Sequence, residues 1–464
     1  MAKDQQGLPL AGAPESAAAF DRAVADYWGL RGDPVGTLKG ALAADSFFAL
    51  GAVAVADLFM IGGFCGDHPE VTKALAAAEA AIDGASERER RHLAAAKAWA
   101  SGRAFDGERM WDDIIADHPT DALALRLVED AHFFHGHSLA IRDSVARVLP
   151  AWERDNPLTS FLLGAHAFGL EESGELGRAE AVGREALAGN PADGWATHAL
   201  AHVFETANRQ EEGIAFLKST RPNWRPAHFM AGHNGWHLGA FLIELGRFEE
   251  TLADYDRFAA PKLADDQTLD RVDAASLLWR LELAGVDVGD RWRPVAEAWM
   301  RHVDDHVSAF NDLHLALAAA RSPDASDAGR VRASLDAYQR LGAGDNHRVT
   351  VEVGRALIDG MLAFAAGAYA EAIDALSSAR NEAIRIGGSH AQRDIVAQTL
   401  IAAAERSGRW RLARALLAER AAIRPTARVR RRRDGPLFRS AYRIHTSQFE
   451  FFLGPLCPIR ARRP

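Results

Sequence analysis

The stretch FLLGAHAFGLEESGELGRAEAVGREALAGNP, residues 161–191, decides the fold. Its pattern indicates two helices joined at Gly174, a residue that readily takes the left-handed conformation that ends a helix. The small side chains of Ala167 and Ala179 allow the two helices to approach closely, and Pro191 stops the second helix. The stretch therefore predicts a helical hairpin.

This spacing is similar to that of the tetratricopeptide repeat, which has a period of about 34 residues. The same frame recurs in one phase along the chain, at Gly102, Trp111 and Pro119; Asn208, Gln210 and Gly213; Gly246, Phe248 and Tyr255; Gly367, Tyr369, Ala372 and Ala379; and Gly408, Trp410, Ala413 and Pro425. We therefore predict an all-α fold, an α-solenoid of tetratricopeptide-like helical hairpins over residues 1–425, with closure around a polar concave centre as one option. Residues 17–66 and 270–340 are helical in pattern but fit the frame poorly, and residues 221–226 are predicted to form a loop.

The composition is that of an ordinary folded protein. Apolar residues make up 48% and charged residues 25% of the 464 residues, which is enough for a sizeable core. Cys65 and Cys457 are the only cysteines, so we expect no disulfide framework and a reducing compartment, the cytoplasm. The start of the chain lacks the apolar segment of a signal peptide. The apolar stretch 47–64 contains Asp57, and we expect a buried core helix there rather than a membrane span.

The charge is distributed unevenly. The net charge is −9, yet residues 426–464 carry ten arginines against Asp434 and Glu450. The acidic body argues against a nucleic-acid-binding groove. The run from Arg430 to Arg433 is a candidate phosphate or partner patch, although a solvated, disordered tail is the favoured interpretation. The absence of a glycine-rich phosphate loop, a nucleophile elbow and a dinucleotide fingerprint argues against nucleotide-dependent and α/β-hydrolase chemistry.

Four histidines form two i,i+4 pairs in neighbouring repeats. Positions 2, 5, 9 and 12 of the first helix of each repeat face the concave surface. With Asn208 at position 15, these positions are Trp195, His198, His202 and Glu205. With Gly246 at position 15, His233 and Trp236 take positions 2 and 5, and His237 lies beside them. Both pairs are therefore predicted to point, wholly or in part, into the same concave space.

Two imidazoles one helical turn apart can bind one metal ion. The candidate ligands of a divalent metal such as zinc, iron or manganese are His198, His202, His233 and His237. Glu205 is then either a further ligand or the base for a metal-bound water. Two other interpretations stay open: proton transfer without a metal, and a polar core in which the imidazoles only form hydrogen bonds.

A further group, His132, His135 and His137, is dense in histidine but is not expected to bind a metal. Its i, i+3, i+5 spacing cannot place all three side chains on one helix face, and Gly136 interrupts the helix.

Other polar residues complete the candidate ligand site. The candidate ligand contacts are Trp195, Asn234, Trp236, Arg280, Gln392 and Arg393, and the candidate catalytic residues are Glu205, Asp312 and His314. Arg393 on an inward face could hold an anionic group. The spacing of Ser389 and Gln392 also fits a helix capping box, and Asp273 with Arg280 fits inter-repeat ion pairing.

Several segments resemble the tetratricopeptide repeat protein 38 family, found in bacteria and animals. The resemblance runs from Gly7 to about Pro425 and rests on RDSVARV (142–148), HALAH (198–202), HNGWH (233–237), LWRLE (278–282), FND (310–312), GGS (387–389) and AQRD (391–394). It implies a helical-repeat fold and marks the two histidine pairs as family-pattern positions. It does not extend to the group at 132–137 or to the tail after Pro425. Members of the family generally lack an assigned activity.

Two functional hypotheses follow. The favoured one is a module that binds a peptide, a protein or a small polar ligand in a pocket lined by His and Trp. The alternative is a metal-dependent, hydrolase-like enzyme that uses the same His cluster, with Glu205 as base and Asp312, His314 and Arg393 orienting an anionic substrate.

Overall fold

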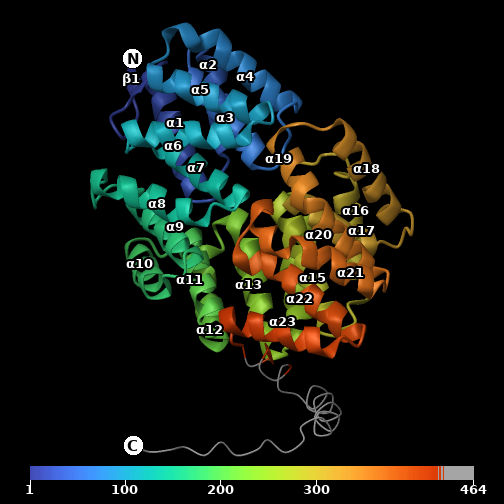
Figure 1. Ribbon diagram of the computed structural model, residues 1–464. Helices are drawn as coiled ribbons and strands as arrows, with labels where there is room; N and C mark the ends of the chain where they lie inside the picture. Colours follow the sequence, from blue (N-terminus) through green and yellow to red (C-terminus); the bar gives the residue numbers. More distant parts are fainter. Residues whose placement is uncertain (427, 430–431, 433–464) are drawn as a thin grey trace, which may run out of the picture.

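The computed structural model describes residues 1–426, 428–429 and 432 (Figure 1). The all-α prediction is confirmed: the regular secondary structure of the described chain is helical apart from a short antiparallel pair, β1 (Ala2–Lys3) and β2 (Pro9–Leu10). Each helix in these ranges is too short or too polar to cross a membrane.

The N-terminal third packs around α3, the helix predicted from the apolar stretch. Its elements are α1 (Pro14–Trp28), α2 (Pro34–Ala44), α3 (Ala49–Ile61), α4 (Pro69–Ala81), η1 (Ile82–Gly84), α5 (Glu87–Ala100) and α6 (Ala104–Asp117). Residues on all sides of α3 are buried, which confirms the expected core helix.

The middle of the chain contains the helices that carry the two histidine pairs, α11 and α13. Its elements are α7 (Ala122–His135), α8 (Ser138–Val148), η2 (Leu149–Ala151), α9 (Thr159–Glu172), α10 (Leu176–Gly189), α11 (Gly194–Thr206), α12 (Gln210–Trp224), α13 (His228–Leu245), α14 (Phe248–Asp254), η3 (Tyr255–Ala259) and η4 (Ala260–Asp265).

The C-terminal part returns toward these helices. Its elements are α15 (Thr268–Leu283), η5 (Gly289–Arg291), α16 (Trp292–Met300), α17 (Ala309–Ala320), α18 (Asp327–Leu341), α19 (Gly344–Val349), η6 (Thr350–Gly354), α20 (Arg355–Ala365), α21 (Tyr369–Ala379), η7 (Arg380–Ile386), α22 (His390–Arg406) and α23 (Trp410–Ile423).

The hairpin joints lie where the repeat frame predicts them. Each predicted joint residue has a positive φ, between 59° and 82°, and separates two helices: Gly102, Gly174, Asn208, Gly246, Gly367 and Gly408. A left-handed residue at each joint reverses the chain within two or three residues. The frame therefore locates the hairpins correctly, while the description of their assembly as a solenoid stays a prediction.

The prediction of a loop at residues 221–226 is wrong for residues 221–224. Helix α12 continues through Pro222 to Trp224 before the chain turns. Trp224 is buried, and its indole Nε1 donates to the carbonyl of Leu217 at 3.1 Å. Because this packing and hydrogen bond stabilise the last turn, the helix tolerates the proline that lacks an amide donor.

Segments far apart in the sequence lie side by side in the middle of the molecule. Helix α22 packs against α15, and η7 packs against α7 (Figure 1). The amide of Gly388 donates to the carbonyl of Phe133 at 3.2 Å. Gly136 has φ +72°, and a Cβ there would collide with the carbonyl oxygen of Ile384, so only glycine fits this approach. Closure brings the start of α22 beside the histidine helices.

The predicted tail begins as a packed segment. Thr426 Oγ1 donates to Glu244 at 2.7 Å, Val429 is fully buried, and Arg432 pairs with Glu405 at 2.6 Å. The rest of the arginine-rich tail lies outside the described residues.

Candidate metal centre

The structure brings the four predicted histidines together at the contact between α11 and α13. The ring centroids of His198 and His202 are 4.5 Å apart, and those of His202 and His237 are 4.6 Å apart. The His233 ring lies 4.9 Å from that of His198 and 5.0 Å from that of His237. Each of the four side chains is buried. The cluster therefore forms a buried, polar centre inside a helical fold.

Local features hold the two helices in this register. Asp193 caps the start of α11 by accepting hydrogen bonds from the amides of Trp195 and Ala196, both at 2.9 Å. Asn234 Nδ2 of α13 donates to the carbonyl of Gly194 at 3.2 Å. A Cβ at Gly194 would lie 2.7 Å from the Cβ of Ala227, so glycine permits this close approach.

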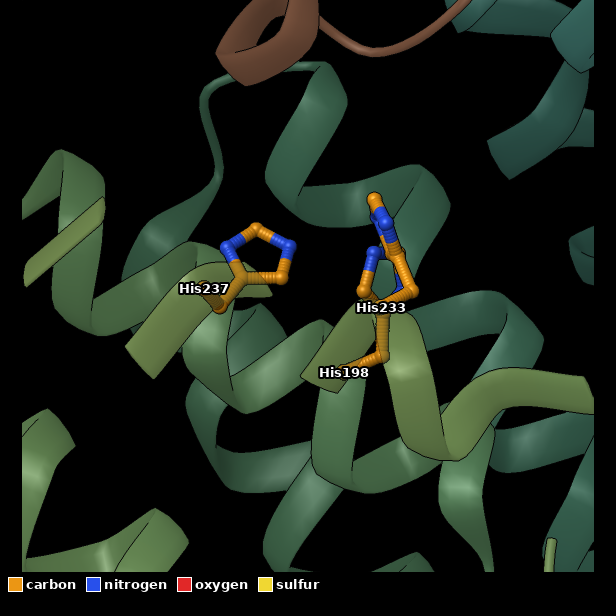
Figure 2. A group of neighbouring side chains, drawn as sticks. All are labelled: His198, His233 and His237. Atoms are coloured by element: carbon orange, nitrogen blue, oxygen red, sulfur yellow. The ribbon is translucent and has the colours of Figure 1, made fainter. Parts of the chain in front are cut away.

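Three of the imidazoles form a set that could hold one metal ion. One ring nitrogen from each of His198, His233 and His237 lies within 4.8 Å of the other two. Figure 2 shows the rings of His198 and His233 beside each other, with His237 facing them. A tetrahedral zinc ion with bonds of about 2.0–2.1 Å to nitrogen requires such convergence.

Two carboxylates fix the orientation of this set. His233 Nδ1 lies 2.8 Å from Asp273 Oδ1, and His237 Nδ1 lies 3.2 Å from Glu205 Oε2. Each carboxylate accepts the Nδ1 hydrogen and leaves the Nε2 lone pair for another partner. Within the described chain, the buried Nε2 of His237 and Nδ1 of His198 have no hydrogen-bond partner. Carboxylate–histidine pairs with a free second nitrogen are the usual surroundings of a metal ligand.

Burial also sets the charge of the cluster. Burial, with the neighbouring imidazoles, lowers the pKa of His198 well below its ordinary value and that of His237 to about 3. Burial alone would raise the pKa of Glu205, but Arg424 and His237 outweigh it and hold this pKa well below the ordinary value. His198 and His237 are therefore neutral near pH 7, the form that a metal requires.

A second group adjoins the first through His202. Its Nε2 lies 3.1 Å from His198 Nε2, and its Nδ1 lies 3.3 Å from Glu171 Oε2. Glu171 also pairs with His390 Nε2 at 3.0 Å. One ligand atom from each of Glu171, Glu172, His202 and His390 lies within 4.8 Å of the others. Arg424 donates to both His390 Nδ1 and Glu205, which links this group to the three-histidine set.

Three of the predicted ligand contacts, Trp195, Trp236 and Arg280, lie around the cluster. Trp195 contacts His198, with ring centroids 5.0 Å apart. Trp236 stacks on His233 with an interplanar angle of 6°. Arg280 lies over Trp236 at 5.1 Å and donates to the carbonyls of Ala391 and Gln392 at 2.9 and 3.1 Å. Trp236 and Arg280 therefore support the walls of the centre.

The residues predicted at the start of α22 have structural partners. Ser389 and Gln392 form the expected capping box, so the side-chain oxygen of Gln392 accepts from the amide of Ser389. Arg393 donates to the carbonyl of Gly388, and its Nη2 lies 3.8 Å from Glu172 Oε2.

Asp312 and His314 lie on α17 and point to different surroundings. Asp312 pairs with His306 Nδ1 at 3.1 Å, and His306 stacks on Tyr338. His314 Nδ1 donates to the carbonyl of Phe310 at 2.8 Å, and burial lowers the pKa of His314 to about 4. The structure therefore places Asp312 in a separate ion pair, apart from the four histidines.

Sequence reasoning missed four residues of the centre: Glu171, Glu172, His390 and Arg424. Glu171 occupies position 12 of the repeat whose joint is Gly174, the same position that Glu205 holds in the next repeat. The frame could thus have identified it. His390 and Arg424 reach the centre only through closure of the chain, with His390 219 positions from Glu171.

A small cavity adjoins the centre beside Glu205. Its volume is about 20 Å³, and its lining includes Arg280, Asp394, Arg420 and Arg424. This volume admits about one water molecule.

No protein-family model matches this chain. The resemblance to the tetratricopeptide repeat protein 38 family therefore stays a prediction.

Proposed function

We propose that this protein is a helical-repeat metalloprotein that binds a divalent transition-metal ion through His198, His233 and His237. The observation that carries the proposal is the convergence of three buried imidazoles, two of them held by carboxylates at Nδ1. Three nitrogen ligands favour zinc, with iron next. Manganese follows because it prefers oxygen ligands.

A polar core without a metal explains this arrangement less well. Hydrogen bonding normally satisfies buried polar nitrogens, and each one left without a partner costs about 1–3 kcal/mol. The unpartnered nitrogens of His198 and His237 lie in the same cluster. One bound cation would satisfy both.

The reaction that best suits this set is metal-assisted hydrolysis. Three protein ligands leave a fourth position open, as in catalytic zinc sites, and a metal there would activate water or polarise a substrate oxygen. Glu205 holds His237 and pairs with Arg424, so we assign it an orienting role. His202 is the candidate general base, because it adjoins the set at His198 and its Nδ1 faces Glu171.

The ligand we propose is small and polar. The cavity beside Glu205 has a volume of about 20 Å³, and its charged lining residues are Arg280, Arg420, Arg424, Glu205, Glu244 and Asp394. A peptide or protein partner would need the walls to open much further, so a small molecule is the better candidate. We place this activity in the cytoplasm. The chain has two cysteines, 392 positions apart, and so few cysteines are typical of proteins in a reducing compartment.

The test is metal analysis of protein purified without a metal-affinity tag, by inductively coupled plasma mass spectrometry. We expect zinc or iron bound to the wild type at the three-histidine centre, and loss of about one equivalent in His198→Ala/His233→Ala. His228→Ala is the matched control, because His228 is an exposed residue in the first turn of α13. Circular dichroism verifies that the variants fold. Equal metal content in the double variant and the control would contradict the proposal.

Asp273 provides a second test, through the orientation of His233. Removing a carboxylate that holds a metal-ligating histidine weakens metal affinity about 10- to 100-fold. We expect this loss in Asp273→Ala, measured by competition with a chromophoric chelator. We expect a smaller loss in Asp273→Asn, whose amide oxygen can still accept from His233 Nδ1. Asp270→Ala is the control, since Asp270 lies on the same helix but pairs with Lys262. A similar affinity loss in both alanine variants would show a general structural effect instead.

A further inference from the structure

A second histidine cluster lies outside the proposed centre, around Glu108 of α6. His132 Nδ1 and His137 Nδ1 each lie 2.7 Å from Glu108 Oε1, and His135 Nδ1 contacts Glu108 Oε2. The sequence spacing argued against this convergence. It occurs because α7 ends at His135 and the left-handed Gly136 turns the chain back, so His137 becomes the residue that precedes α8.

The three histidines of this cluster have different surroundings. The second ring nitrogen of His132, Nε2, lies 2.9 Å from Ser144 Oγ, so both of its nitrogens have protein partners. His135 stacks on Trp99, with ring centroids 5.2 Å apart. The side chain of His137 is 46% exposed, whereas that of Glu108 is 9% exposed. The cluster therefore has a buried carboxylate and one imidazole open to solvent.

From this arrangement we infer a second metal site, in which Glu108, His135 and His137 bind a divalent transition-metal ion such as zinc. One ligand atom from each of the three lies within 4.8 Å of the others. Two imidazoles and one glutamate form a known catalytic zinc ligand set that leaves a position for water. His132 is a positioning residue: it holds Glu108 and is itself held by Ser144.

The ligand set can change from hydrogen bonding to metal binding without net proton transfer at the histidines. A neutral imidazole that carries its hydrogen on Nε2 presents the Nδ1 lone pair to the ion. The carboxylate of Glu108 then serves as an anionic ligand. The exposed edge of His137 gives the ion a path from solvent.

This site would couple metal binding to closure of the chain. Its ligands belong to α6, the last residue of α7 and the residue before α8. The turn between the two histidines packs against Ile384 of η7, and Phe133 accepts from the amide of Gly388. An ion bound to the folded state alone would therefore stabilise the contact between the two parts of the chain.

The direct test is modification of histidines by diethyl pyrocarbonate, located by peptide mass spectrometry, with and without Zn²⁺. We expect Zn²⁺ to slow the modification of His137 at least tenfold in the wild type. Exposed His228 in the same sample is the internal control and should react equally in both conditions. In Glu108→Gln the protection of His137 should disappear. Equal reaction of His137 with and without Zn²⁺ would overturn the proposal.

A second measurement keeps the test decisive if Glu108→Gln fails to fold. His137 precedes α8 without a side-chain capping hydrogen bond and is partly exposed, so His137→Ala should fold normally. Metal-free protein is titrated with Co²⁺ and followed by visible absorption. We expect His137→Ala to bind one equivalent of Co²⁺ fewer than His228→Ala. An unchanged stoichiometry would contradict the site. Both readouts are independent of the three-histidine centre, because the His198→Ala/His233→Ala variant should keep the protection of His137.

Discussion

Asp121→Asn is expected to lower the free energy of unfolding by about 3–5 kcal/mol, the range for breaking a buried ion pair. Asp121 is 1% exposed and accepts from Arg88 Nη1 at 2.7 Å, from the amide of Ala124 at 3.0 Å, and lies 2.9 Å from His92 Nε2. One carboxylate therefore caps α7 and neutralises a buried guanidinium. Without this charge, Arg88 still donates to the carbonyl of Pro9 and pairs with the more distant Asp4, at 3.5 Å. Urea unfolding followed by circular dichroism measures the loss.

A nearby exposed pair provides the control for this prediction. Arg91 Nη1 and Asp117 lie 2.7 Å apart, the same distance as in the buried pair, but the Asp117 side chain is 65% exposed. Exposed pairs contribute about 0–1 kcal/mol, so Asp117→Asn should hardly change stability. Equal losses in the two variants would show that burial does not determine the effect.

The same buried carboxylate predicts a pH dependence. Burial alone would raise the pKa of Asp121, but His92 and Arg88 outweigh it and hold this pKa well below the ordinary value of 3.8. A lowered folded-state pKa gives stability that is present above the unfolded-state value and is lost as pH falls through the folded-state value. The difference in free energy of unfolding between wild type and Asp121→Asn should therefore have its largest value at pH 7 and begin to decrease below about pH 3.8. A difference that grew on acidification would contradict this assignment.

His202→Gln is expected to lower the rate of metal-dependent hydrolysis about 100-fold, the lower end of the range for loss of a general base. His202 is fully buried, adjoins His198 at 3.1 Å and faces Glu171 at 3.3 Å. Glutamine retains hydrogen-bonding groups of similar size but cannot take up a proton near neutral pH. The probe substrates are p-nitrophenyl phosphate and p-nitrophenyl acetate with zinc-loaded protein. Metal content should stay unchanged, because the proposed ligands are the other three histidines.

Three comparisons separate the possible outcomes for His202. Loss of metal together with rate would assign His202 to the ligand set. Equal rates in His202→Gln and wild type would contradict its role as base. If the metal-loaded wild type hydrolysed neither substrate, the proposed hydrolysis of these ester classes would be contradicted. The metal analysis would still show whether the three histidines bind a metal ion.

Much of the fold followed from local sequence features. Residues at the joints of the frame, such as Gly174 and Asn208, have the left-handed conformation expected of them. The frame also placed His198, His202 and Glu205 on one side of α11 and predicted that they would face His233 and His237. Local steric preferences and helical periodicity determine such positions, so they need no knowledge of distant contacts.

Other features depended on surroundings that spacing does not encode. Pro222 lies inside a helix because burial of Trp224 and its hydrogen bond to Leu217 offset the missing amide donor. Asp312 and His314 both lie on α17 but have separate surroundings, because Asp312 pairs with His306 of the preceding turn. Propensity gives a small preference at such positions, and tertiary contacts override it.

The sequence by itself determined the helical hairpins, their joints and the sharing of one face by the histidine pairs, because each depends on residues within one repeat. Only the tertiary structure decided which groups complete the sites. His390 and Arg424 reach Glu171 and Glu205 from 219 positions away. His132, His135 and His137 meet on Glu108 from the end of α7 and the turn that follows it. The physical reason is that buried charges and imidazoles need partners, and the closed packing of distant helices supplies them.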